Sequence, residues 1–484
     1  MAEDLKEKTI TGVIWSAVQK FGSTALSFIS TIVLARLLTP EDYGCIGMLA
    51  IFLAVSSTFI DGGFGSALIQ KKRPTREDYS TIFYWNLGLS IFLYTVLFFS
   101  APAISRFYNL PLLCSVLRVQ GIVLIVDAAR IVQVNQLRKQ LRFKKIATIN
   151  LSVSAVSLAV TIYLAWRGFG VWALVAQQLM VGVLTTTIFW ITGQWTPVLT
   201  FSMQSFKELF GFGGFILLSN LINTFCNNIQ GLLIGKFYNP ATMGYYSKAK
   251  STEEISSSFI STVIDQVSYP VLSEAQNDKT LMIRMLKKFI GVLAYVTFPV
   301  MLLLILIAKP IFIILYSERW LPSVPYFQIL CFAGMAICLQ GINYYAVAAI
   351  GKSKDLFKWT VIKRLVGLCF VVGGLVLAGI KGVLIGTVLG TFFVYFVNAG
   401  LVSKHVGYTG RQQFLDLLPI LIVSFVSCFF AFVIGCFLNT NIYVDGIIKL
   451  AVFCITYFGI SMLFKMEAFI STKDVLNSLL HKTK

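Results

Sequence analysis

The sequence predicts an all-α polytopic membrane protein with 14 transmembrane helices, arranged as two repeated six-helix lobes plus two C-terminal helices. Its 484 residues are 57% hydrophobic and only 13% charged, whereas a soluble domain is about half apolar and a quarter charged. Apolar runs long enough to cross a bilayer recur along the whole chain, and one sequence pattern returns after 200 residues. This composition argues against a soluble enzyme and excludes an intrinsically disordered chain and a coiled coil.

Runs of about 20 mainly apolar residues define the expected helices. Those of the first lobe, the N-lobe, are expected at 10–37, 43–66, 81–104, 112–135, 146–166 and 169–192. Those of the second lobe, the C-lobe, are expected at 209–236, 243–272, 284–308, 326–350, 357–379 and 382–403, and the final pair at 414–437 and 444–465. Because most connections are short, we expect three consecutive parts: the N-lobe at 1–193, the C-lobe at 194–405, and the final helices with a cytoplasmic tail at 406–484.

An internal repeat is the reason to expect a helix at 243–272, a segment that hydropathy alone would assign to a loop. At an offset of 200, RLLTPEDYG at 36–44 aligns with KFYNPATMG at 236–244, and SSTFI at 56–60 aligns with SSSFI at 256–260. The second helix of the chain therefore has a polar counterpart. Internal repeats of this kind are common in secondary transporters, which place their substrate between the two halves.

The distribution of basic residues predicts the orientation. Lys and Arg outnumber Asp and Glu by 40 to 21, which gives a formal net charge of +19. With a cytoplasmic N-terminus, 27 of the 40 basic residues fall in inside segments and 11 in outside ones. This bias follows the positive-inside rule, so we expect both termini in the cytoplasm and no nucleic-acid partner. The start, MAEDLKEK, leads into an apolar run without a small-residue cleavage site, which indicates a retained first helix.

The sequence contains no pattern for a metal site, a cofactor or an enzyme. The nine cysteines are scattered without CxxC spacing, and the two histidines are His405 and His481, so we expect no metal and no disulfide framework. There is no GxSxG, HExxH or P-loop motif, which argues against catalysis and direct ATP coupling. Transport would then draw on a gradient of H⁺ or Na⁺, on the membrane potential or on the substrate's own gradient.

Charged side chains at membrane depth are costly and usually face a bundle interior or a water-filled cavity. Lys20 lies about ten residues into the first helix, near the expected midplane; it either attracts an anionic substrate or forms a structural ion pair. Asp127 and Arg130 are three residues apart on the fourth helix, which places them on one face. They either pair within the helix or line a cavity.

The eighth expected helix carries a polar stripe that either lines a cavity or marks a loop wrongly taken as a helix. The stripe advances in helical steps and consists of Lys250, Glu254, Ser258, Ser261 and Asp265, widened by Lys248, Thr252 and Glu253. A helix with such a stripe cannot face lipid on that side.

Amides and further carboxylates complete the candidates. Asn220, Asn223 and Asn227 follow helical spacing on the seventh helix; they either bind sugar hydroxyls or hold helices together. Asp61 precedes Gly62 and Gly63 and either ends its helix or couples an ion. The candidate sites for a coupling H⁺ or Na⁺ are Asp61, Asp127, Glu253, Glu254 and Asp265.

Several stretches resemble signature sequences of the polysaccharide transporter family. They are GVIWSAVQKFGS at 12–23, VLARLLTPEDYG at 33–44, GFGVWALVAQQL at 168–179, NNIQGLLIGKFYNPATMGYYSKA at 227–249, SERWLPSVPYFQIL at 317–330 and IGKSKDLFKWTVIKR at 350–364. The resemblance runs from about residue 8 to about 435. This family includes the Wzx-type flippases and belongs to the multidrug/oligosaccharidyl-lipid/polysaccharide superfamily. The nearest subgroup is that of the colanic-acid exporter.

The resemblance implies a function as well as a fold. Such proteins move undecaprenyl-pyrophosphate-linked oligosaccharide units from the cytoplasmic to the periplasmic leaflet of a bacterial inner membrane, by alternating access of two lobes around a central cavity. The products are O-antigen, capsule or exopolysaccharide. The expected partners are this lipid-linked glycan, membrane lipid, and polymerase or ligase machinery. By analogy with the lipid II flippase, 414–437 and 444–465 would hold the polyprenyl chain.

On this interpretation, the expected cavity binds the glycan and its pyrophosphate. The hypothesised substrate-binding residues are Lys20, Arg130, Asn220, Asn223, Asn227, Lys248 and Lys250, of which the three lysines would engage the pyrophosphate. The acidic neighbours Glu253, Glu254 and Asp265 depart from a purely cationic cavity.

Three alternatives stay open at the level of sequence. A multidrug or cation antiporter of the same superfamily would need a cavity lined by acidic and aromatic residues. Lys20, Lys248 and Lys250 argue against it. A membrane-embedded glycan polymerase or ligase would need a large periplasmic loop with basic and His residues, which the sequence lacks. A scaffold without transport activity is the third alternative.

Overall fold

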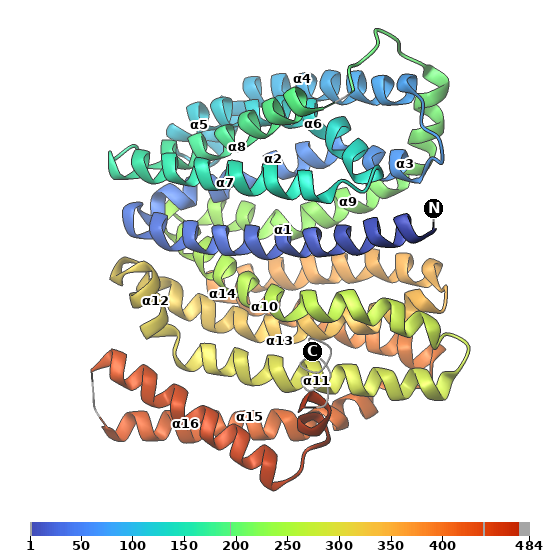
Figure 1. The fold of residues 1–484 in the computed structure, drawn as a ribbon. Helices are drawn as coiled ribbons and strands as arrows, with labels where there is room; N and C mark the ends of the chain where they lie inside the picture. Colours follow the sequence, from blue (N-terminus) through green and yellow to red (C-terminus); the bar gives the residue numbers. More distant parts are fainter. Residues whose placement is uncertain (1, 194, 439–440, 474–484) are drawn as a thin grey trace. The chain divides into compact units, whose positions relative to one another are not determined.

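The computed structural model describes residues 2–193, 195–438 and 441–473 (Figure 1). Some side chains lie outside this description, namely those of residues 2–10, 13, 212, 259, 262–267, 270, 353 and 438. The expected site residue Asp265 is one of them. All regular structure in the described ranges is helical. The chain folds as two compact units, Met1–Ser247 and Lys248–Lys484, and each is described by itself.

In its described residues, the first unit holds nine helices and the start of a tenth. They are α1 (Ala2–Leu37), α2 (Pro40–Asp61), α3 (Phe64–Gln70), α4 (Arg76–Phe107), α5 (Leu112–Gln120), α6 (Ile122–Lys139), α7 (Phe143–Trp166), α8 (Val171–Thr192), α9 (Met203–Phe237) and the first turns of α10 (Pro240–Glu274).

The second unit holds the rest of α10 and the C-terminal helices. These are α11 (Lys279–Leu306), α12 (Ala308–Tyr316), the short 3₁₀ helix η1 (Glu318–Ser323), α13 (Val324–Ala349), α14 (Ser353–His405), α15 (Gly410–Leu438) and α16 (Ile442–Leu463).

The protein is a multi-pass membrane protein. Within the described residues, 11 helices are long and apolar enough to cross a membrane, and the bent pair Met203–Gly211 and Gly213–Phe237 would make 12. The polar helix α10 is not among them. The all-helical membrane fold is thus confirmed, and the number of 14 spans stays a prediction.

Glycines mark two breaks in the helices: one lies inside the helix expected at 43–66, and the other lies at the expected boundary between 357–379 and 382–403. The helix expected at 43–66 ends at Asp61, because Gly62 and Gly63 adopt left-handed φ values of 57° and 71°, and α3 starts afresh at Phe64. The helix α14 contains a break at Ala378 and Gly379, where Gly379 has φ 60°. His405 at its end bonds Asp355 at its start over 2.8 Å, so the two parts fold back as a hairpin.

The repeat is visible in the helix boundaries of the first unit. The helices α1 and α9 end at Leu37 and Phe237, and α2 and α10 begin at Pro40 and Pro240. Proline suits the first turn of a helix, where its missing N–H has no partner to lose. The turn before α2 is fixed further by a capping box between Thr39 and Asp42.

The starts of α2 and α10 cross through a reciprocal contact inside the first unit, which includes residues 240–247. A Cβ placed on Gly44 would overlap the backbone carbonyl of Pro240, and a Cβ placed on Gly244 would overlap that of Pro40. Each separation would be well under the 3.0 Å that real Cβ atoms respect. We call this contact the Pro–Gly crossing; two aligned positions of the repeat thus meet in space.

Side-chain hydrogen bonds to backbone carbonyls connect distant helix ends of the first unit. Lys139 donates to the carbonyl of Leu68 over 2.9 Å, and Gln133 donates to that of Trp195 over 2.9 Å. Lys236 donates to the carbonyl of Phe107 over 2.7 Å. These contacts tie together helix ends, and one connecting segment at Trp195, that are far apart in the sequence.

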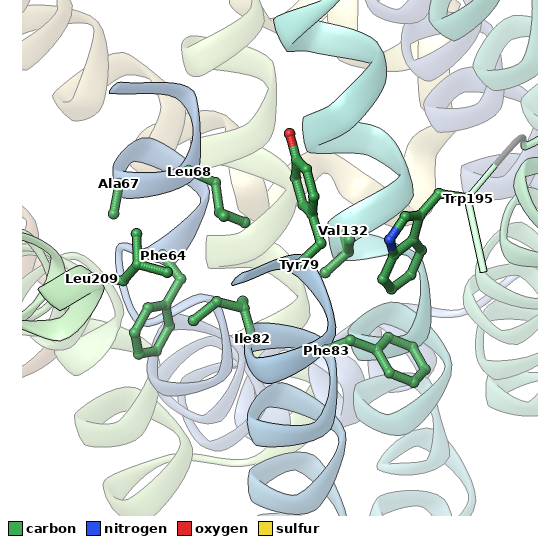
Figure 2. Close-up of a cluster of buried hydrophobic side chains, with 9 residues drawn as sticks. All are labelled: Phe64, Ala67, Leu68, Tyr79, Ile82, Phe83, Val132, Trp195 and Leu209. Atoms are coloured by element: carbon green, nitrogen blue, oxygen red, sulfur yellow. The ribbon is translucent and has the colours of Figure 1, made fainter. Parts of the chain in front are cut away.

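A buried apolar cluster holds α3 against α4, α6 and α9. Figure 2 shows its side chains, which are Phe64, Ala67, Leu68, Tyr79, Ile82, Phe83, Val132, Trp195 and Leu209. The rings of Phe83 and Trp195 lie 5.8 Å apart in an edge arrangement, a preferred aromatic geometry. The cluster fixes the short helix α3 and the charged loop that follows it.

Candidate functional site

The first unit contains a cavity of about 560 Å³ between α1, α6, α7 and α8. Its polar lining is supplied by Ser23, Ser27, Ser30, Thr31, Asp127, Arg130, Ser154, Gln177 and Gln178. We call it the hydroxyl cavity. Its volume lies in the range of small-ligand pockets, and its hydroxyl and amide groups are suited to sugar hydroxyls or to a cation.

An ion pair occupies one wall of the hydroxyl cavity. Arg130 Nη2 lies 2.9 Å from Asp127 Oδ1, one turn apart on α6, and both side chains are about one-third exposed or less. The intrahelical pair that the sequence allowed is therefore present, and it also borders a cavity. Gln177 donates to Ser30 over 3.3 Å, which ties α8 to α1 beside it.

The other candidates of the first unit do not line this cavity. Lys20 and Asp61 are exposed on α1 and at the end of α2. On α9, Asn220 and Asn227 are exposed and Asn223 is half-buried. The neighbouring Thr224 forms a 3.0 Å hydrogen bond with Thr58 of α2, so this face of α9 contributes to helix contacts as well as carrying the exposed amides.

In the second unit, Lys248 is enclosed by aromatic rings. It is 2% exposed, and its Nζ lies 5.1 Å from the ring centre of Tyr316 and 5.0 Å from that of Trp320. This is cation–π geometry. Contact between Lys248 and a substrate would require these two rings to move.

Two further features of α10 are a buried acid and an ion pair between a half-buried lysine and an exposed glutamate. Glu253 is 3% exposed, and its Oε1 has no hydrogen-bond partner among the described atoms. A Cβ on Gly334 would lie 2.5 Å from this oxygen, so the glycine makes room for it. Lys250 lies 3.8 Å from the exposed Glu254, one turn away. The structure thus brings together Lys250 and Glu254 and sets Glu253 apart.

A larger pocket of about 860 Å³ lies between α11, α15 and α16. Its walls are apolar and include Leu418, Ile422, Val423, Val426, Ile460 and Phe464. Its mouth carries six charged side chains, Arg284, Lys287, Lys288, Asp416, Lys465 and Glu467. We call it the C-terminal pocket.

Sequence reasoning missed the mouth of the C-terminal pocket as a site. It counted the basic residues of the segments that start α11 and follow α16 only as topology signals. The three basic residues within the five positions 284–288 are the signal that could have indicated a site. It also considered α1 only through Lys20 and overlooked the spacing of Ser23, Ser27 and Ser30 on one face.

A further charged cluster surrounds Lys71, in the loop between α3 and α4. Its Nζ lies 3.0 Å from Asp78, which is 1% exposed, and 3.0 Å from Glu208. Burial lowers the pKa of Lys71, but hydrogen bonds to Glu208 and Asp78 outweigh it and raise the pKa above the usual lysine value. Since every charge is paired, we assign this cluster a structural role.

Within the described ranges, no group of three or more His, Cys, Asp or Glu side chains could hold a metal ion. The hydroxyl cavity and the C-terminal pocket each bring polar or charged groups of described residues together around a space that could hold a ligand.

Comparison with known proteins adds a family and a fold. Residues 33–325, more than half of the chain, match the family described as polysaccharide biosynthesis protein. The lipopolysaccharide biosynthesis protein WzxC of Escherichia coli (strain K12) is 24% identical over 434 residues, which cover 87% of this chain and 88% of the relative. The succinoglycan biosynthesis transport protein ExoT of Rhizobium meliloti (strain 1021) is 23% identical over 430 residues, 88% of this chain and 85% of the relative.

Among solved structures, the lipid II flippase MurJ in an inward closed conformation matches with a TM-score of 0.77 at 14% identity. The match covers 93% of this chain and 98% of that chain. At this identity the likeness shows the fold alone.

Proposed function

Because this chain belongs to the polysaccharide biosynthesis protein family, we propose that it is a flippase for lipid-linked oligosaccharides. It moves undecaprenyl-pyrophosphate-linked repeat units from the cytoplasmic to the periplasmic leaflet of a bacterial inner membrane, and the units serve polysaccharide synthesis. The names of the two relatives, a lipopolysaccharide biosynthesis protein and a succinoglycan transport protein, support this substrate class.

The observation that carries the proposal is the C-terminal pocket. Its apolar walls on α15 and α16 suit the polyprenyl chain, which can stay in a lipid-like environment while the headgroup crosses. The glycan, by contrast, needs a path with hydrogen-bond partners, because unsatisfied polar groups are costly in hydrocarbon. The hydroxyl cavity shows that this chain builds such polar surface inside its helical bundle.

The proposed topology has 14 spans with both termini in the cytoplasm. The 12 apolar candidates reach this number if the two parts of the α14 hairpin cross separately and the polar helix α10 crosses as well. The N-lobe at 1–193, the C-lobe at 194–405 and the final part at 406–484 then follow from the repeat.

Alternating access of the two lobes is the proposed mechanism. In it, Lys20 and Lys250 meet the pyrophosphate, Lys248 joins them when its aromatic enclosure opens, and Arg130 with the α9 amides contacts the glycan. One of the carboxylates Asp61, Asp127, Glu253, Glu254 or Asp265 carries a coupling H⁺ or Na⁺. An inside-negative potential favours outward movement of the anionic headgroup by roughly 2.3 kcal/mol per charge per 100 mV.

The proposal is tested by deleting the gene and profiling polyprenyl-linked lipids by mass spectrometry. We expect one undecaprenyl-pyrophosphate glycan to accumulate and to disappear when the wild-type gene is restored. Restoration with a Lys20→Ala, Lys250→Ala double variant should fail although the protein is inserted normally. A matched Lys354→Ala, Lys358→Ala variant, which removes two exposed lysines, should restore export. Unchanged lipids together with new sensitivity to cationic drugs would instead indicate the antiporter.

A further inference from the structure

The mouth of the C-terminal pocket combines side chains from three separate parts of the chain. Arg284, Lys287 and Lys288 come from the first turns of α11, Asp416 from the first turns of α15, and Lys465 and Glu467 from the residues after α16. Loops near 276, 407 and 465 are all expected on the cytoplasmic side. On this proposed topology, the charged side chains form a rim on the cytoplasmic side of the pocket, near the lipid headgroups.

The acidic side chains of this rim are already engaged. Asp416 accepts a hydrogen bond from Tyr408 over 2.7 Å and lies 3.2 Å from Lys287. The largely exposed Glu467 lies 4.0 Å from the same lysine. Lys287 thus forms ion pairs with both carboxylates. None of the described acidic groups forms an ion pair with Arg284, Lys288 or Lys465.

The backbone at Lys465 is unusual for its residue type. This residue has φ 45°, a left-handed conformation in which glycine or asparagine is preferred. The conformation turns the chain sharply after α16, so that Lys465 joins the same rim as Glu467 while Phe464 joins the apolar lining. A lysine at this position therefore carries a conformational cost that a charge at the rim would explain.

Charge and shape together identify the ligand. Four cationic and two anionic side chains leave the rim a net charge of +2, above an apolar pocket of about 860 Å³. A diester-linked pyrophosphate has a negative charge on each of its phosphates, whereas a phospholipid such as phosphatidylglycerol has a single one. Arg and Lys form charge-assisted hydrogen bonds with phosphate oxygens, and Arg does so through two donors at once.

We propose that Arg284, Lys288 and Lys465 form a docking site for the pyrophosphate of an isoprenoid lipid, whose chain lies in the C-terminal pocket. The site captures the lipid from the cytoplasmic leaflet before the headgroup enters the transport path. Its residues are different from the lysines of α1 and α10 that are proposed to contact the pyrophosphate during transport. The inference rests on the proposed function for its biological role, and it can be tested by binding alone.

The first test measures binding to the purified full-length protein by native mass spectrometry, with undecaprenyl pyrophosphate and phosphatidylglycerol as probes. The variant is the triple substitution Arg284→Gln, Lys288→Gln, Lys465→Gln. We expect its affinity for undecaprenyl pyrophosphate to fall by about tenfold or more, because the loss of even one hydrogen bond between charged groups lowers affinity by about this factor. The matched control is Lys352→Gln, Lys354→Gln, Lys358→Gln, which removes three exposed charges elsewhere in the second unit and should bind like wild type.

A charge-keeping variant separates binding from folding. Arg284→Lys, Lys288→Arg, Lys465→Arg should retain most of the affinity, whereas a purely structural role of these side chains would make both triple variants equally poor. Equal affinity of the Gln variant and wild type for undecaprenyl pyrophosphate overturns the proposal. So does preferential binding of phosphatidylglycerol by wild type, which would make the pocket a phospholipid site.

Translocation in proteoliposomes distinguishes this inference from the proposed function. If wild type translocates the lipid-linked glycan and the Gln variant does so with unchanged KM, the docking site is wrong and the flippase stands. If wild type translocates nothing but binds undecaprenyl pyrophosphate through the three cations, the docking site stands and the flippase is wrong.

Discussion

Substitution of Gly44 tests the Pro–Gly crossing directly. A Cβ there would overlap the carbonyl of Pro240, and because that carbonyl belongs to the backbone, no side-chain rotation relieves the clash. The two helix starts would have to separate by an amount on the order of 1 Å, and overpacking of this kind costs about 3 kcal/mol at the upper end of the usual range. Alanine gains about 1 kcal/mol over glycine in a helix, so we expect Gly44→Ala to destabilise the protein by about 2 kcal/mol.

The reciprocal contact also predicts the stability of the double variant Gly44→Ala, Gly244→Ala. Gly244→Ala should cost a similar amount, because its Cβ would overlap the carbonyl of Pro40 in the same way. Once one alanine has separated the two helix starts, the Cβ of the second alanine overlaps less with the opposite carbonyl. The double variant should therefore lose clearly less stability than the sum of the two single variants.

The assay is thermal unfolding of the purified full-length protein, followed by tryptophan fluorescence. A loss of about 2 kcal/mol corresponds to a decrease in Tm of roughly 5 °C for a unit of this size. The control is Gly88→Ala in α4, whose added Cβ would have no atom within 4 Å and should leave Tm equal or slightly higher. If Gly44→Ala melts at or above the wild-type temperature, or if the two losses add fully, the crossing is not the close contact described.

Three other predictions concern charges. Lys71→Met should lower Tm. Because the folded-state pKa of Lys71 is raised, the difference in Tm between variant and wild type should persist from neutral pH up to the usual lysine pKa of 10.5 and shrink only above it. A difference in Tm that already becomes smaller near pH 8 would contradict this. Arg130→Met should cost about 1 kcal/mol, since the pair with Asp127 is partly exposed, and Asp127→Asn added to it should recover most of the loss in the same melting assay. Glu253→Gln should keep or raise Tm, because an isosteric amide replaces a buried carboxyl that has an oxygen without a hydrogen-bond partner. Transport by this variant in proteoliposomes should lose its response to a pH gradient. A retained response would show that Glu253 is not the proton site.

Helix positions were predictable because they depend on local signals. Apolar runs and prolines at 40 and 240 define where α2 and α10 begin, and the offset of 200 predicted that the polar segment 243–272 is helical. The same signals allowed Asp61 to end its helix, as it does, but the expected helix still continued to residue 66. A Gly-Gly pair tolerates both a continuous helix and a left-handed turn, and packing decides between them.

The sites were harder to predict because they depend on packing between distant segments. Sequence spacing correctly allowed an ion pair between Asp127 and Arg130, which are neighbours on one helix. It could not show that Lys248 lies between two aromatic rings more than 60 residues away. Nor could it show that residues near 284, 416 and 465 share one pocket.

The Pro–Gly crossing has the geometry of an isologous interface, in which one patch meets its own copy: the glycine of each helix start contacts the proline of the other. Two identical polypeptides related by a two-fold axis would make this contact without any further adaptation. Gene duplication and fusion of such a homodimer would then explain why the matching residues are 200 positions apart and still touch. The present chain would have kept the ancestral dimer contact as an intramolecular one, and each half would limit how far the other could diverge at these two positions.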